Sequence, residues 1–226
     1  ELNAVTRWEL KNGATPTPFQ SMVACSGLPQ TVEEYGFGLR GVKKRGHTVI
    51  NPEGITIWEM GNECIWRENG VWSLEYYTPR LLKPRYFDTV NNKTVNFNTD
   101  FLKPFLKRFY RAITAAVPST CIFLEGVPGN PVPRWYSYDG HRVANASHWY
   151  DSFTLMNKKY IPWLGYDPIH ERVVIGKKRV YKSFAMQLSE HKKNSARMMG
   201  GVPTVIGEFG LPFDINNRKA YRNNNF

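Results

Sequence analysis

Two glutamates have the chemical type and the position to carry out catalysis. Glu63 ends a run of β-branched and aromatic residues over 54–63, and Glu208 ends a shorter run over 202–208. Both runs predict buried parallel strands, whose carboxyl ends meet at an edge where active sites lie. Two carboxyl groups there can hydrolyse a glycosidic bond, because one protonates the leaving oxygen while the other attacks the sugar or activates water. The pattern alone equally allows structural roles as helix caps or ion-pair partners.

The elements that must position these glutamates follow from hydrophobic periodicity. Two more strands are predicted, one over 121–125 and one ending at 147–151, and each ends in a carboxylate or an imidazole. Apolar residues at helical spacing predict amphipathic helices over 99–117 and 180–199. Strands that alternate with helices in this way predict an α/β fold built from parallel β/α units.

Three short motifs resemble those of family 5 glycoside hydrolases. The segment 58–64, Trp-Glu-Met-Gly-Asn-Glu-Cys, looks like the Asn-Glu-Pro motif of that family's fourth strand, with cysteine in place of the usual proline. The segment 205–210 looks like the nucleophile motif of the seventh strand, and 148–150, His-Trp-Tyr, is similar to the His-x-Tyr element of the sixth. The motifs occur in the family's order. The longer segments 148–155 and 207–214 most resemble the endoglycoceramidase and glycosylceramidase branch.

This resemblance implies a role for each matching residue. Glu63 would be the general acid/base and Glu208 the nucleophile of a retaining mechanism, with their carboxyl groups about 5 to 5.5 Å apart. Asn62 would hydrogen-bond the sugar 2-hydroxyl, while His148 and Tyr150 would orient the site, with Tyr150 close to Glu208. For these three residues the structural alternatives are a turn residue and a packed core pair.

The resemblance covers about residues 54–220 and implies a TIM-barrel, (β/α)8 type of fold that is incomplete here. An eight-unit barrel uses roughly 30 residues per unit, so the chain has room for only about the fourth to seventh strands. We expect one partial catalytic domain over 1–226. Its expected divisions are a loop-rich part over 1–53, strands four to seven with their helices over 54–210, and the start of the next unit over 211–226. An open arc leaves strand edges uncovered, so we expect poor folding and no activity unless the missing units are supplied.

Other chemistries lack a matching pattern in the sequence. The segment 36–41 matches G-x-G-x-x-G literally, but no buried strand precedes it and no helix follows it, so we expect a flexible loop. The motifs of zincins, serine hydrolases and P-loop nucleotidases are absent from the sequence. Five histidines and three cysteines show no metal-ligand spacing. We therefore expect no metal and no organic cofactor.

The charge balance bears on binding partners. Thirty Lys and Arg against 19 Asp and Glu give a formal net charge of +11. This charge favours polyanions or an acidic membrane surface, but it lies in short clusters without a nucleic-acid recognition motif. We expect a carbohydrate or glycolipid substrate and a peripheral contact with an acidic membrane surface, and no dedicated nucleic-acid site. The sequence leaves compartment and oligomeric state open.

The long aromatic segment 65–98 is expected to wall the site on the leaving-group side, through Trp66, Trp72, Tyr76 and Tyr77, unless these rings simply pack the segment onto the fold.

The first functional hypothesis is a retaining β-glycosidase acting on a β-glucoside or glycolipid with a hydrophobic aglycone. The second is a non-catalytic carbohydrate- or lipid-binding remnant of such a barrel. A basic nucleic-acid-binding protein is the third.

Overall fold

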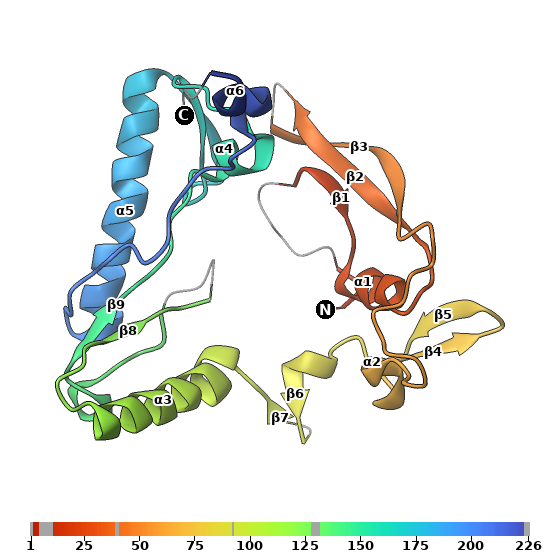
Figure 1. The fold of residues 1–226 in the computed structure, drawn as a ribbon, viewed down its shortest axis with the longest axis horizontal. Helices are drawn as coiled ribbons and strands as arrows, with labels where there is room; N and C mark the ends of the chain where they lie inside the picture. Colours follow the sequence, from red (N-terminus) through yellow and green to blue (C-terminus); the bar gives the residue numbers. More distant parts are fainter. Residues whose placement is uncertain (1, 5–10, 39–40, 92, 128–131, 224–226) are drawn as a thin grey trace. The chain divides into compact units, whose positions relative to one another are not determined.

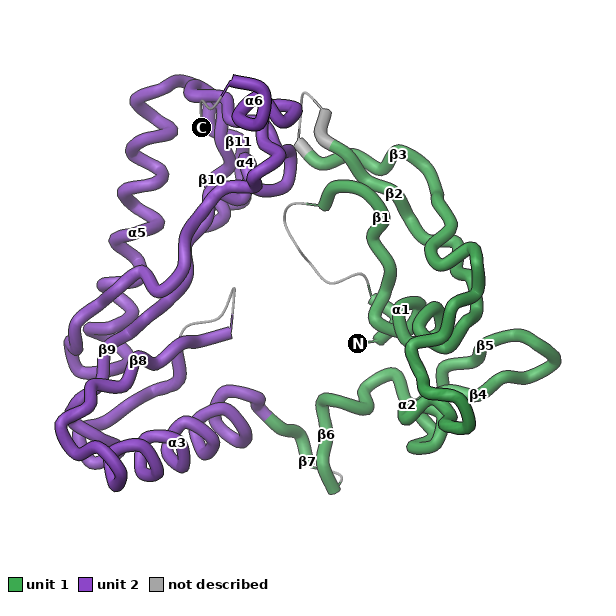
Figure 2. The backbone as a smooth tube through the Cα atoms, viewed as in Figure 1, with its two compact units in different colours: residues 1–95 green, residues 96–226 purple. Residues whose placement is uncertain are grey.

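The computed structural model describes residues 2–4, 11–38, 41–91, 93–127 and 132–223. The chain forms two compact units, residues 1–95 and 96–226, which are described separately (Figure 2). The single partial domain expected from the sequence stays a prediction.

The first unit begins with a three-stranded antiparallel sheet and one helix (Figure 1). The sheet has the order β1 (Gly13–Thr15), β2 (Gln30–Gly38) and β3 (Gly41–Ile50), and α1 (Pro18–Cys25) lies between β1 and β2 in the chain. Thr17 begins α1 through a capping box: its side chain accepts from the backbone N–H of Gln20, whose side chain accepts from the backbone N–H of Thr17.

The expectation of a loop-rich segment over 1–53 is therefore wrong. Its strands are polar, and they are held by the β2–β3 ladder and by cross-strand pairs such as Glu33 with Lys44, whose Nζ lies 2.5 Å from the carboxylate. A solvated hairpin of this kind carries little hydrophobic periodicity. The flexible loop expected over 36–41 is also wrong, because the described residues of this segment close β2 and open β3. Leu39 and Arg40 lie outside the described residues.

The rest of the first unit consists of short elements. They are α2 (Ile65–Glu68), β4 (Trp72–Glu75), β5 (Thr78–Leu81), a 3₁₀ turn (Tyr86–Asp88), β6 (Thr89–Val90) and β7 (Lys93–Thr94). β4 pairs with β5, and β6 pairs with β7, both antiparallel. Their core is a cluster of buried residues: Leu2, Met22, Val23, Cys64, Val71 and Trp72.

The strand predicted over 54–63 is not a regular strand. Its backbone meets the end of α1, through an antiparallel bridge between Thr56 and Ser26 and a bond from Ile57 N to Cys25 O. A strand exists only where neighbouring backbone completes its hydrogen bonds. Ile55 and Ile57, which the prediction placed in a core, are more than 60% exposed.

The second unit contains part of the predicted β/α succession. A π-helical turn (Phe97–Leu102) leads into α3 (Lys103–Ala116), then follow β8 (Ile122–Leu124), a 3₁₀ turn (Ser137–Asp139), β9 (Val143–Asn145), α4 (Ser152–Asn157), β10 (Leu164–Asp167), β11 (Arg172–Ile175), α5 (Lys177–Met199) and α6 (Ile215–Asn223). β8 and β9 are parallel, with Ile122 opposite Val143. α3, α5 and β8 confirm three sequence predictions.

Regular strand structure stops at Asn145, ahead of the strand end predicted at 147–151, and the strand predicted over 202–208 is reduced to one parallel bridge at Thr204. The antiparallel hairpin over 164–175 was not predicted.

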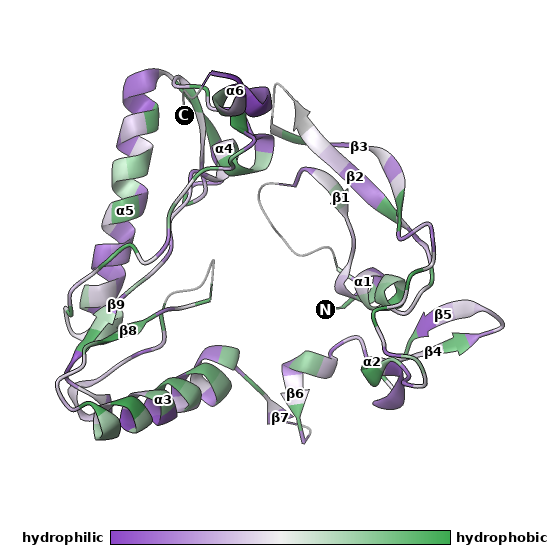
Figure 3. Ribbon diagram, viewed as in Figure 1, coloured by the Kyte–Doolittle hydropathy of each residue, from purple (hydrophilic) through white to green (hydrophobic). Residues whose placement is uncertain are grey.

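The core of the second unit lies between α3, α5 and the parallel strands. Its buried members are Leu106, Ile122, Leu124, Val132, Trp135, Val143 and Met199. Apolar residues recur every three to four positions along α3, between polar ones, as an amphipathic helix requires (Figure 3). The described residues show a small parallel sheet here and two- and three-stranded sheets elsewhere, so the TIM-barrel class stays a prediction.

A buried carboxylate fastens α3 to the chain that follows β8. Asp139 has no exposed side-chain surface, and its oxygens lie 2.8 Å from both Lys103 Nζ and Lys107 Nζ. Burial raises the pKa of Asp139, but the hydrogen bonds from the two lysines outweigh it and hold that pKa at about 2. Next to it, Gly140 has φ +155°, and an added Cβ would lie 2.5 Å from the Tyr110 ring, so only glycine fits.

Among the described helices, none combines the length and the apolar composition that crossing a bilayer requires.

Candidate active site

Three predicted site residues come together in the second unit. The segment 203–208 lies parallel to the chain that continues from β9, through bonds from Asn145 N to Pro203 O, Val205 N to Asn145 O and Gly207 N to Ser147 O. One more bond, from Trp149 N to Glu208 O at 2.9 Å, extends the pairing to the end of both segments. This pairing places His148, Tyr150 and Glu208 side by side.

The side chains of these residues also make contact. The Tyr150 hydroxyl donates a hydrogen bond to Glu208 Oε1, and His148 Nδ1 lies 3.6 Å from Glu208 Oε2. Donation to the carboxylate raises the pKa of Tyr150, since losing the proton would place two negative charges together. Tyr150 therefore stays a hydrogen-bond donor that holds one oxygen of Glu208.

Glu125 is a fourth member of this group. His148 Nε2 lies 3.1 Å from Glu125 Oε1, so the imidazole stands between Glu125 and Glu208. Both carboxylates are about half exposed, with side-chain accessibilities of 48% and 55%. The sequence analysis assigns Glu125 no role, although it ends the strand predicted over 121–125 just as Glu63 and Glu208 end theirs.

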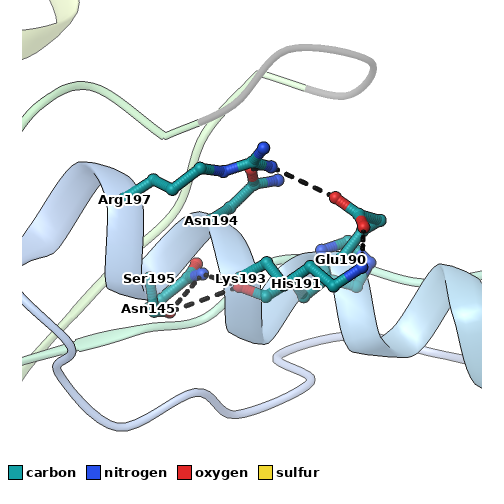
Figure 4. A network of polar contacts seen from close by, with 7 residues as sticks. All are labelled: Asn145, Glu190, His191, Lys193, Asn194, Ser195 and Arg197. Carbon is teal, nitrogen blue, oxygen red and sulfur yellow. Dashed lines mark hydrogen bonds and ion pairs between the residues drawn. The ribbon is translucent and has the colours of Figure 1, made fainter.

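A buried polar network fixes the strands beneath these side chains (Figure 4). Asn145 is fully buried, and its amide donates to Ser195 Oγ at 2.9 Å and to His191 O at 3.3 Å of α5. Its amide oxygen accepts from Ser147 Oγ at 2.6 Å, and Ser195 Oγ lies 2.6 Å from Thr204 Oγ1. Asn145 thus ties α5 to both segments of the site. Its burial also closes the glycosylation sequon at 145–147 in the folded protein.

Gly207 lets the two segments approach. A Cβ at this position would lie 2.5 Å from the carbonyl oxygen of Ala146, closer than atoms can come. On the outer face of α5, Glu190 pairs with Lys193 at 2.6 Å and Arg197 at 3.1 Å, and these solvent-facing ion pairs contribute little to the site (Figure 4).

Asn62 and Glu63 lie in the first unit. The backbone N–H of Asn62 donates to Glu59 O in a turn. The Glu63 side chain is 65% exposed, and among the described residues the cation within 4 Å of it is Arg67, with Nη2 3.9 Å from Oε2. The carboxyl separation between Glu63 and Glu208 stays a prediction.

Cys64 stands where the Asn-Glu-Pro motif has proline. It has φ −62° and ψ 117° and is the N-cap residue of α2. These angles lie within the range of proline, so the backbone after Glu63 keeps the conformation that the motif implies. The side chain is buried in the core of the first unit.

The rings of the aromatic segment lie in different environments. Trp72 is 1% exposed in the core, so for this ring the expectation is wrong and packing explains it. Trp66 packs edge-on against Trp58, with ring centroids 5.5 Å apart. Tyr76 and Tyr77 form the two-residue turn between β4 and β5, at φ 47° and 64°, and are 100% and 94% exposed.

Within the described residues, His, Cys, Asp and Glu side chains form no group of three or more that could hold a metal ion.

The chain is similar to proteins named glucosylceramidase and ergosteryl-beta-glucosidase, although no protein-family model matches it. It is 30% identical over 227 residues to a glucosylceramidase of Rhizopus delemar, a match that covers 95% of this chain and 33% of that protein. It is 30% identical over 251 residues to the ergosteryl-beta-glucosidase of Saccharomyces cerevisiae, covering 96% of this chain and 33% of that one. The chain therefore spans about a third of the length of the curated relatives it matches.

The fold of the chain is also similar to that of a solved structure. The crystal structure of sterylglucosidase 1 from Cryptococcus neoformans matches with a TM-score of 0.83 and 26% identity, over 98% of this chain and 35% of that one.

Proposed function

We propose that the protein is a retaining β-glycosidase that hydrolyses a β-glucoside with a hydrophobic aglycone, such as a glucosylceramide or a steryl glucoside. The observation that carries the proposal is the group formed by Glu208, Tyr150 and His148 at the ends of paired parallel segments. The names of the relatives, glucosylceramidase and ergosteryl-beta-glucosidase, support the substrate class.

In this proposal Glu208 is the nucleophile. The Tyr150 hydroxyl holds Oε1, which leaves Oε2 to attack the anomeric carbon. Glu63 gives its proton to the leaving oxygen as the glycosidic bond breaks, and the aglycone departs as an alcohol. Glu63 then takes a proton from water, the water oxygen attacks the anomeric carbon, and the bond to Glu208 breaks. Asn62 binds the sugar 2-hydroxyl.

His148 and Glu125 are positioning residues in this scheme. An imidazole between two carboxylates can donate to only one of them while neutral, and the shorter contact is to Glu125. This contact fixes the ring beside Glu208 without using up the lone pairs of the nucleophile.

The test uses a chimera in which these 226 residues replace the aligned third of the Rhizopus delemar glucosylceramidase. Glu208→Gln should abolish turnover of every β-glucoside. Glu63→Gln should slow a substrate with a poor leaving group at least about a hundredfold, yet spare the first step with dinitrophenyl glucoside, which needs no proton. Glu59→Gln, an exposed carboxylate in the same turn, is the matched control and should leave both rates unchanged.

Retention is checked separately by proton NMR, which should show β-glucose as the first product. First-formed α-glucose, or equal losses on both substrates in Glu63→Gln, would contradict the assigned roles. Substrate binding without turnover in the unaltered chimera would favour the non-catalytic alternative.

A further inference from the structure

A pocket outside the candidate active site is lined by cations. It has a volume of about 390 Å³ and lies between β11 and the first turns of α5. Arg172 comes from β11, and Arg179 and Lys182 come from α5. The pocket is contained in the second unit.

The three cations converge because of helical and strand geometry. Positions 179, 182, 183 and 186 of α5 all line the pocket, and this spacing of three and four residues puts them on one stripe of the helix. β11 lies against α5 and presents Arg172 to the same space. Two different elements therefore supply the positive charge.

Among the described residues, these cations have little counter-charge. Arg179 and Lys182 have no carboxylate within 4 Å among the described residues, and Arg172 Nε is 3.8 Å from Asp167. Asp167 is the carboxylate of the lining, but it is already engaged. Its oxygens accept from two backbone N–H groups of the following turn and lie 2.8 Å from His170 Nδ1. Three cations and one satisfied carboxylate favour an anion.

A buried hydroxyl adds a hydrogen-bond donor. Ser183 lines the pocket and is 5% exposed. Its oxygen accepts from Gln187 Nε2 at 3.1 Å, and its hydrogen has no acceptor within the described parts of the chain. The hydroxyl is therefore free to donate to an anionic oxygen.

Some of the residues that line the pocket are exposed and aliphatic, and we call these the rim. They are Val173 and Ile175 of β11, which are 37% and 60% exposed, while Val174 between them is buried. Free phosphate gains nothing from exposed aliphatic groups, whereas the interfacial region of a bilayer accepts them beside cations. The rim therefore favours a lipid phosphate over a free one.

The pocket lies at the same end of the unit as the candidate active site. Along β9 and the residues after it, Asn145 contacts Ser195 of α5, and Trp149 contacts Gln187. The helix thus runs antiparallel to this segment. Its turns from 179 to 186 lie beyond Trp149, at the end of the unit toward which β9 points. His148 and Tyr150 are at that end as well.

We propose that this pocket binds the phosphate of an anionic phospholipid. The end of the second unit where His148 and Tyr150 lie would thereby dock on a bilayer. Arg172, Arg179 and Lys182 bind the phosphate oxygens, Ser183 donates a hydrogen bond, and Val173 and Ile175 lie in the interfacial region. The proposal goes beyond glycoside hydrolysis, and it is tested by binding alone.

The test is flotation of the 226-residue chain, and of the chimera, with phosphatidylcholine vesicles that contain or lack phosphatidic acid; protein that aggregates by itself does not float. The pocket variant is Arg172→Gln/Arg179→Gln/Lys182→Gln. The control variant is Lys177→Gln/Lys178→Gln/Lys192→Gln, which removes the same charge from the same helix outside the pocket lining. We expect partition into phosphatidic-acid vesicles to fall about tenfold further in the pocket variant than in the control.

Inorganic phosphate, titrated calorimetrically, separates the two sources of the anion. Val173→Ser/Ile175→Ser should weaken vesicle binding several-fold and leave phosphate binding unchanged. Equal losses in pocket and control variants would show a diffuse basic surface and overturn the proposal. Phosphate binding without vesicle binding would overturn the lipid as its source, and binding of neither would overturn the site.

Discussion

The two glutamate motifs lie in contrasting surroundings. Around Glu208, the segments 145–149 and 203–208 pair through their backbones, and buried Asn145 joins both to α5. Around Glu63, the segment 54–63 is joined to the end of α1 by one backbone hydrogen bond, from Ile57 N to Cys25 O. Among the described residues, the Glu63 carboxylate contacts a cation only at 3.9 Å, from Arg67. The motifs are equally clear in the sequence. The difference shows that a motif defines the chemical groups, while paired neighbouring backbone defines their geometry.

The largest effect should come from removing the charge that anchors α3. Asp139→Asn would leave Lys103 and Lys107 without their shared carboxylate, and we expect a loss of about 3 kcal/mol in the second unit. Hydrogen exchange in the chimera should show α3 amides losing protection, with the β2–β3 hairpin unchanged. Equal loss of protection in both units would mean that their stabilities are not separate.

Lowering the pH should remove the stabilisation by the Asp139 carboxylate without a mutation. The folded pKa of Asp139, about 2, lies below its ordinary value near 4, so this stabilisation is complete above about pH 5 and is lost as the pH falls toward 2. The amount is on the order of 2 kcal/mol. Urea unfolding of the chimera followed by tryptophan fluorescence should show the difference between wild type and Asp139→Asn shrinking over that range. A constant difference would contradict the low pKa.

A methyl group added at Gly207 should loosen the backbone pairing around Glu208, so that this segment is paired as weakly as the one before Glu63. Gly207→Ala would push 203–208 away from Ala146, at a cost of about 2 kcal/mol, and separate Glu208 from Tyr150. Gly210→Ala is the matched control, because its nearest contact would be an ordinary 3.9 Å. We expect turnover in the chimera to fall at least about tenfold for Gly207→Ala and little for Gly210→Ala. Similar rates for both would show that close pairing is not needed.

The smallest predicted effect is a gain in stability in the first unit. Tyr76 and Tyr77 both have positive φ in a two-residue turn, which suits Asn-Gly. Tyr76→Asn/Tyr77→Gly should stabilise the β4–β5 hairpin by about 1 kcal/mol, seen as slower exchange of its amides, while α3 is unchanged. Faster exchange would show that the exposed rings stabilise the hairpin through contacts of their own.

The sequence predicted the elements whose stability depends on apolar burial. α3 and α5 follow from their apolar stripe, and β8 from a short apolar run. The β2–β3 hairpin escaped notice because its ladder and its Glu33–Lys44 pair require no hydrophobic pattern. Among site residues, His148, Tyr150 and Glu208 were predicted and lie together. Glu125 ends the strand predicted over 121–125 but received no role, since it belongs to none of the three motifs, and its contact with His148 places it in the site.

The central claim is that Glu208 attacks the sugar. The most direct measurement treats the chimera with a 2-deoxy-2-fluoro-β-glucoside that carries an activated leaving group, which slows release of the covalent intermediate, and locates the sugar by peptide mass spectrometry. If Glu208 is the nucleophile, we expect one label, on Glu208, and none in Glu208→Gln. A label on Glu63 or Glu125 would contradict it.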